Sequence, residues 1–223
     1  MAAIGARPRI GYRPRRPTPT IGEWTGGQTI AATATESFGS RLVRGLLVGL
    51  FRASGWRAQG QLPALDKYVV VGASHTSNWD FVVFVGTIAE LGRHVRFVGK
   101  HSLFRWPFGG LMRALGGVPV NRDTTRDLVQ QVADQFAAHE DFLLIIAAEG
   151  TRARVEQWRT GFYRIAQVAN VPIVCAGPDY ASRCGVIGPT IWPTGDYDAD
   201  MVPAYAFFRS LHPRHPARAG FPA

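Results

Sequence analysis

A histidine and an aspartate with the spacing His-x4-Asp, His75 and Asp80, follow an apolar run at residues 68–73. Histidine can act as a general base near neutral pH, and a neighbouring carboxylate can fix its tautomer and stabilise the imidazolium. On one regular helix the two side chains would point about 140° apart. They can meet only if His75 lies on a loop and Asp80 in a first helical turn, which Ser77 or Asn78 as an N-cap would permit. Alternatively, Asp80 only favours the helix dipole and His75 is an ordinary loop residue.

Two further polar clusters also follow apolar segments. Glu149-Gly150-Thr151-Arg152 comes after the run FLLIIA at residues 142–147, and Arg122 comes after a short strand-like segment at residues 118–120. A guanidinium at such a position can bind a phosphate group with two hydrogen bonds. Alternatively, these residues form a surface ion pair and a solvated loop charge. Together, these three strand ends carry a base (His75), an acid (Glu149) and two arginines. This combination favours chemistry on a phosphorylated substrate.

The elements that would position these residues alternate along the chain. Strands are predicted at residues 68–73, 95–98, 118–120, 142–147 and 171–176, and helices at residues 80–91, 108–115, 124–139, 156–170 and 197–211. Strands separated by helices indicate an α/β fold, with a mixed, largely parallel central sheet covered by helices on both faces. We therefore predict a single α/β domain that begins at residue 57 and ends at residue 211.

The segments outside this domain are of different kinds. Residues 1–36 are rich in Arg, Pro, Gly and Thr and are predicted to be flexible, as is the tail at residues 212–223. Residues 37–54 predict an amphipathic helix in which apolar residues fill more than half of the circumference. Arg41, Arg44 and Arg52 cluster in the remaining arc. Such a helix can lie in a membrane interface or pack as an ordinary core helix with a solvated basic face, and the segment alone leaves both open.

Composition restricts the partners. The net charge of +9 is carried by 23 arginines and two lysines among 223 residues, so an anionic partner is expected: a nucleic acid, an anionic lipid or a phosphorylated molecule. The two cysteines make neither a disulfide framework nor a four-ligand zinc site. No apolar run of signal-peptide length follows the first arginines, so no signal peptide is predicted. No apolar run reaches the roughly 18 residues of a spanning helix, so no transmembrane helix is predicted.

The combined motifs resemble the 1-acyl-glycerol-3-phosphate acyltransferase family of the glycerolipid acyltransferases. Four blocks of that family appear in order over residues 57–195. They are the His-x4-Asp (HX4D) pair, the segment from Gly116 to Arg122, the block from Glu149 to Arg152, and Val171-Pro172-Ile173-Val174. The segment before the second block, which contains Lys100, is also similar. Asn121 departs from the family, since an Asp is usual there.

The resemblance implies a role for each matching residue. His75 would be the general base, Asp80 would orient it, and Glu149 would order the site. The acceptor phosphate would be bound by Arg122, Gly150, Thr151 and Arg152, with Lys100 as a further substrate-binding candidate. No metal and no cofactor are implied, because the acyl thioester of coenzyme A or acyl carrier protein is a co-substrate.

The expected function is transfer of a fatty acyl group to a lysophospholipid, with 1-acyl-glycerol-3-phosphate giving phosphatidic acid. Residues 37–56 would then be a membrane-interface helix, and the protein a peripheral one on the cytoplasmic face of the cell membrane, bound to an anionic surface. Alternatives are another lysolipid or glycolipid acceptor, and a non-catalytic membrane-binding or nucleic-acid-binding protein. Nucleic acid is not the expected partner, because the arginines near the core stand singly rather than in a stripe with aromatic residues.

Overall fold

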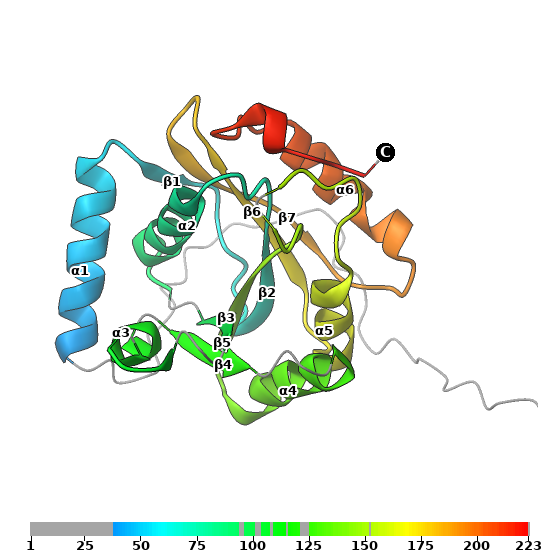
Figure 1. Cartoon of the computed structure of the whole chain (residues 1–223), viewed down its shortest axis with the longest axis horizontal. Coiled ribbons are helices and arrows are strands. Elements are labelled where there is room, and N and C mark those ends of the chain that lie inside the picture. Colours follow the sequence, from blue (N-terminus) through cyan, green and yellow to red (C-terminus); the bar gives the residue numbers. More distant parts are fainter. Residues whose placement is uncertain are drawn as a thin grey trace, which may run out of the picture. The chain divides into compact units, whose positions relative to one another are not determined.

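The computed structural model describes residues 38–93, 96–100, 104–107, 109–114, 116–120, 125–151 and 153–222 (Figure 1). The predicted flexible segment 1–36 lies outside these residues. Arg122 and Arg152, two of the predicted phosphate-binding residues, also lie outside them.

Between residues 67 and 179, the described strands and helices alternate as the sequence predicts. The strands are β1 (Arg57–Gln59), β2 (Lys67–Gly72), β3 (Arg96–Lys100), β4 (Gly117–Val120), β5 (Phe142–Ala147), β6 (Ile173–Asp179) and β7 (Cys184–Ile191). The helices are α1 (Phe38–Ala53), α2 (Asn78–Glu90), α3 (Gly109–Ala114), α4 (Thr125–Ala138), α5 (Gly161–Ala169), α6 (Tyr197–Arg209) and the short 3₁₀ helix η2 (Pro216–Arg218).

The strands form one mixed, mostly parallel sheet, which confirms the predicted fold class. The strand order is β1-β7-β6-β2-β5-β3-β4, and β6 with β7 is the antiparallel pair. The sequence analysis missed β7, because its segment CGVIGPTI contains two glycines and a proline, residues that are depleted in strands. It also missed β1, whose three residues are too few to show a periodicity.

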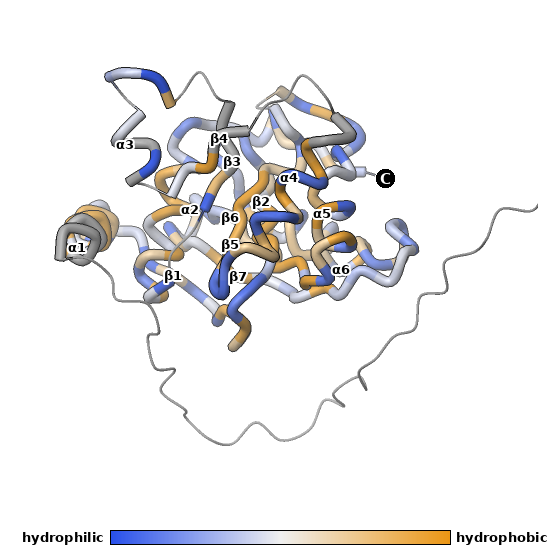
Figure 2. The backbone as a smooth tube through the Cα atoms, turned by 90° about the horizontal axis from the view of Figure 1, so that it is seen from below, coloured by the Kyte–Doolittle hydropathy of each residue, from blue (hydrophilic) through white to orange (hydrophobic). Residues whose placement is uncertain are grey.

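Alternate residues of the central strand β2 enter two separate cores. Val69 and Val71 belong to a core built with α4, α5 and α6, whereas Tyr68 and Val70 belong to a core built with α2. Helices therefore cover both faces of the sheet, and both faces of β2 are apolar, as in other buried parallel strands. Figure 2 shows the hydrophobic strands β2 and β5 between the helices.

Helix α1 packs against α2 through one end of its apolar face. The Phe51 ring is buried, and it lies so close to Gly86 of α2 that a Cβ at that glycine would sit 2.4 Å from the ring. Arg52 binds Glu90 at 2.6 Å, so this arginine pairs with a protein carboxylate. Leu42, Leu46 and Leu50 remain 60–66% exposed. The helix is thus anchored to the domain at Phe51 and presents a leucine stripe to its surroundings.

The predicted start of α5 was wrong by five residues. The structure begins this helix at Gly161, and the residues before it make other contacts. The Arg159 amide donates to the Ala148 carbonyl at 3.0 Å, and the Trp158 indole N–H donates to the Gly220 carbonyl at 3.2 Å. These contacts to distant segments replace the first helical turn.

The C-terminal segment, predicted to be a flexible tail, contacts the domain at several points. The Tyr180 amide donates to the His212 carbonyl at 2.9 Å, and Gly220 lies against the backbone of Val155. Because these contacts are made largely by backbone groups, residue types did not reveal them. Residues 212–222 consequently lie along the loops that follow β5 and β6 in the structure.

The contact between Gly86 and Phe51 predicts a position-specific cost. Gly86→Ala should lower the free energy of unfolding by about 1–3 kcal/mol, because the added methyl group must displace the Phe51 ring. Gly45→Ala in α1 is the matched control. A Cβ at Gly45 meets no atom within 4 Å, so this substitution should be neutral or stabilising. Urea unfolding of both variants checks the prediction, and equal stabilities would contradict the packing of α1 on α2.

Candidate active site

The loop between β2 and α2 holds the His-x4-Asp pair, and the helix cap determines its geometry. Ser77 is the N-cap of α2, and Asp80 is the third helical residue of a capping box. His75 therefore lies on the loop, whereas Asp80 lies in the first helical turn. This is the arrangement that the sequence analysis required for the two side chains to meet.

Asp80 is fully buried beside the imidazole of His75. The His75 Nδ1 lies 3.6 Å from the Asp80 Oδ2, and the His75 side chain is 23% exposed. The same Oδ2 accepts hydrogen bonds from the amides of Thr76 and Ser77, each at 2.7 Å. A carboxylate facing Nδ1 favours the tautomer with the proton on Nδ1, which makes Nε2 the basic nitrogen. The 3.6 Å separation exceeds a hydrogen bond, and catalytic pairs often shorten when substrate binds.

Tyr180, directly after β6, occupies the other oxygen of Asp80. Its hydroxyl donates to the Asp80 Oδ1 at 2.6 Å, and its ring packs edge-on against Trp56 at 4.9 Å between centroids. Burial raises the pKa of Tyr180, and the hydrogen bond to Asp80 raises it further, so the hydroxyl remains a donor at neutral pH. Sequence reasoning missed Tyr180. The available signal was its place after a buried parallel strand, where the other site residues also stand.

Glu149 joins the loop after β5 to the loop after β2. Its side chain is 3% exposed, and its Oε2 accepts a hydrogen bond from the His75 amide at 2.8 Å. Burial raises the pKa of Glu149 to about 7, the His75 amide opposes this shift, and the charge of Asp80 adds to it. Glu149 therefore orders the backbone of the histidine loop, and it carries a proton part of the time at neutral pH.

The glycine of the Glu-Gly-Thr-Arg block is required by the local backbone. Gly150 has φ +64°, and a Cβ there would lie 2.8 Å from the Arg159 side chain. Gly150 and Thr151 are both exposed, and the Thr151 hydroxyl accepts from the Ala153 amide at 3.3 Å. Lys100 is the last residue of β3 and pairs in register with Val120 of β4, which places its backbone at the carboxyl edge of the sheet.

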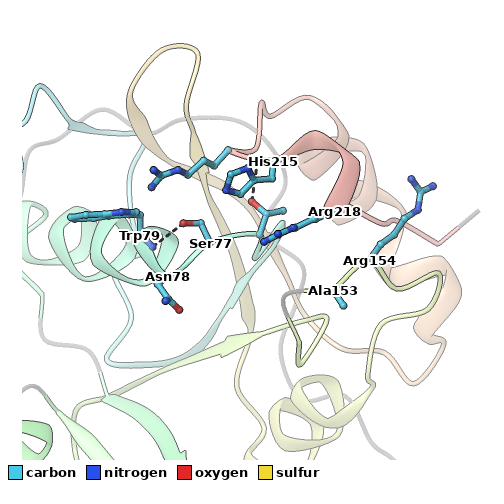
Figure 3. Close-up of a pocket in the computed structure, with 9 residues that line it drawn as sticks. Ser77, Asn78, Trp79, Ala153, Arg154, His215 and Arg218 are labelled. Carbon is cyan, nitrogen blue, oxygen red and sulfur yellow. Dashed lines mark hydrogen bonds between the residues drawn. The ribbon is translucent and has the colours of Figure 1, made fainter.

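A pocket of about 780 Å³ opens beside the histidine loop (Figure 3). Residues 76–79 line one side, Ala153 and Arg154 come from the loop after β5, and Arg214, His215 and Arg218 come from the C-terminal segment. The His215 amide donates to the Thr76 hydroxyl at 3.4 Å, which joins the C-terminal segment to the histidine loop. These three residues were not predicted as site residues, because the composition of residues 212–223 indicated a flexible tail.

The metal-binding potential of the site can be assessed within the part of the chain that the structure describes. There, no group of three or more His, Cys, Asp and Glu side chains could hold a metal ion. The site residues instead form a base held by a buried carboxylate, an arrangement that can remove a proton from a bound hydroxyl group.

An α/β domain that places such a base at the carboxyl end of its central strand can support the transfer of a group to a hydroxyl. The chain belongs to the acyltransferase family, whose model, described as Acyltransferase, matches residues 57–177. The protein is therefore an acyltransferase, as the motifs predicted.

Among solved structures, the chain is similar to the 1-acyl-sn-glycerophosphate (LPA) acyltransferase PlsC from Thermotoga maritima. The TM-score is 0.51 at 16% identity, over 73% of this chain and 74% of that one. This similarity supports the fold. A search of the curated proteins found no match.

The raised pKa of Glu149 predicts a pH-dependent effect of Glu149→Gln. The wild-type protein favours the protonated carboxyl when folded, so its stability falls as pH rises from about 4.5 to about 7. The glutamine has no such proton to lose. Its stability relative to wild type should therefore increase between pH 5 and pH 8, by at most about 3 kcal/mol. Urea unfolding at both values measures this, with the exposed Glu156→Gln as the control. A pH-independent difference would show that Glu149 is ionised throughout.

Proposed function

We propose that the protein transfers a fatty acyl group from an acyl thioester to the free hydroxyl of a lysophospholipid, most directly 1-acyl-glycerol-3-phosphate, giving phosphatidic acid. The observation that carries this proposal is the partly exposed His75 against the buried Asp80. A base of this kind suits a hydroxyl acceptor, which must lose a proton as it attacks. The printed name of the similar Thermotoga maritima protein agrees with this acceptor.

The proposed mechanism is direct transfer. The His75 Nε2 takes the proton of the acceptor hydroxyl while the hydroxyl oxygen forms a bond to the carbonyl carbon of the thioester. The carbon–sulfur bond then breaks, and the imidazolium returns the proton to the leaving thiolate. Asp80 stabilises the imidazolium between these steps, and the Tyr180 hydroxyl and two backbone amides hold Asp80 in place.

The residues around this pair have supporting roles in the proposal. Glu149 fixes the backbone of His75 and so orients the base. Arg122, two residues after β4, and Arg152, in the Glu-Gly-Thr-Arg block, would bind the acceptor phosphate with the exposed Gly150 and Thr151. Lys100 would contribute at the carboxyl end of β3. An acceptor with a different head group, such as another lysolipid or a glycolipid, would use the same base.

The decisive experiment is a thioester-release assay over a panel of lysolipids. Wild type should be most active with 1-acyl-glycerol-3-phosphate, and His75→Ala should lose at least ~10²-fold, because the general base is removed. His139→Ala is the matched control, since His139 precedes β5 at the opposite edge of the sheet. Near-normal turnover by a folded His75→Ala protein would refute the mechanism. A preference for another lysolipid would refute the acceptor alone.

We further propose that the protein acts as a peripheral protein on a membrane surface, where both lipids reside. No helix in the described part of the chain is long and apolar enough to span a bilayer. Leu42, Leu46 and Leu50 form an exposed stripe along α1 while Phe51 holds the helix to the domain. Insertion of exposed leucines can bind a protein reversibly to an interface, and an anionic surface would add attraction for the net charge of +9.

Leu46→Glu tests the membrane surface. Because the Leu46 side chain is 63% exposed, the fold should be retained while binding to anionic vesicles falls at least about tenfold. Val202→Glu on α6 is the matched control, since Val202 is 61% exposed on the other face of the sheet. Vesicle co-sedimentation with circular dichroism gives both readouts. Unchanged binding, or loss of the fold, would contradict an interfacial role for α1.

A further inference from the structure

The pocket beside the histidine loop has a strongly basic lining. Three arginines and a histidine line it, namely Arg154, Arg214, Arg218 and His215, and none of its described lining residues is acidic. The arginines therefore attract a ligand with several negative charges. Figure 3 shows Arg218 extending toward the loop that bears Ser77, whereas Arg154 extends away from that loop.

The strongest donors for such a ligand are the guanidinium groups. The amides at the start of α2 are already used, because those of Thr76 and Ser77 donate to Asp80 and that of Trp79 donates to the Ser77 hydroxyl. Guanidinium groups bind phosphate oxygens through paired, charge-assisted hydrogen bonds. A phosphate in this pocket would consequently be held by Arg218 and Arg214 rather than by the helix terminus.

The pocket also presents an aromatic face. Trp79 lines it, and this side chain is 58% exposed although it is large and apolar. An exposed indole beside arginines can stack against a flat base, as aromatic side chains do with nucleotide bases. A ligand with both a base and phosphate groups matches this lining better than a phosphate alone.

The position of the pocket favours the acyl donor over the acceptor. Thr76 and Ser77 line the pocket, whereas His75, Asp80 and Glu149 do not. In a glycerol phosphate acceptor, the reacting hydroxyl and the phosphate belong to one small unit, so that phosphate must lie close to His75. In coenzyme A, the long pantetheine arm separates the thioester from the nucleotide, so its phosphates can bind in a neighbouring pocket.

From these observations we infer that the pocket receives the adenine nucleotide end of an acyl-coenzyme A donor, an inference that rests on the proposed acyl transfer. Trp79 stacks on the adenine, and Arg214 and Arg218 bind the phosphates. The phosphopantetheine arm of an acyl carrier protein carries no base and one phosphodiester, so it would leave Trp79 without a partner. The C-terminal segment thus forms part of the donor site.

Arg218→Ala is the most informative variant. Arg218 is exposed on η2, so its removal should leave the fold intact, whereas Arg214 also interacts with the Tyr180 hydroxyl and could disturb Asp80. Isothermal titration of the full chain with adenosine 3′,5′-bisphosphate should show binding that weakens about tenfold or more in Arg218→Ala, because charge-assisted hydrogen bonds are lost. Arg218→Lys should recover part of the affinity. Arg164→Ala, an exposed arginine of α5, should bind as wild type does.

Kinetics with truncated donors complete the test. Arg218→Ala should raise the KM for acyl-coenzyme A about tenfold and leave the KM for acyl-pantetheine and for the lysolipid unchanged. An increase in the lysolipid KM alone would assign the pocket to the acceptor. Arg218-dependent use of acyl carrier protein without nucleotide binding would assign it to that carrier. Either result, or Arg218-independent nucleotide binding, overturns the inference. If no lysolipid is acylated but the bisphosphate binds through Arg218, the proposed function fails and the nucleotide site stands.

Discussion

Burial of the Asp80 carboxylate is the constraint on which the arrangement of the site depends. A fully buried charge is costly unless it is paired and hydrogen-bonded. Three donors satisfy Asp80: the amides of Thr76 and Ser77 and the hydroxyl of Tyr180. The first two fix the loop as it enters α2, and the third ties this loop to the end of β6. These three hydrogen bonds fix the orientation in which the Asp80 carboxylate faces the His75 ring.

The parallel register of the central strands brings the other site residues to this point. Gly72 of β2 pairs with Ala147 of β5, so the two strands end at the same level. The residues that follow them consequently meet, and the Glu149 carboxylate accepts from the His75 amide. The carboxyl ends of β3 and β4 belong to the same edge, because these strands are parallel to β5. Two sequence blocks that are 74 residues apart thus become neighbours because β2 and β5 end together.

The exposed leucine stripe of α1 lies apart from the active site but is linked to it through helix packing. Helix α1 packs on α2, which carries the histidine loop at its N-terminus, and the Phe51–Gly86 contact sets how closely the two helices approach. The exposed leucines of α1 are therefore connected to the active site through α2. In the reaction proposed for a membrane surface, such a connection would fix the orientation of the site relative to the lipid.

The sequence by itself determined the fold class and most of the elements, because buried parallel strands are continuous apolar runs and α4 carries a clear periodic pattern. It also determined His75, Asp80 and Glu149 as candidates, because their types and spacing follow those strands. It could not determine β7, whose Gly188 and Pro189 fall at the register irregularity opposite Val174 and Ala176 of β6. Nor could it determine Tyr180 or the residues from 212 to 218, since they reach the site through long-range contacts such as the Tyr180 hydroxyl to Asp80 and the His215 amide to the Thr76 hydroxyl. These two contacts join residues 100 and 139 positions apart, and they leave no local pattern, so only the tertiary structure decided them.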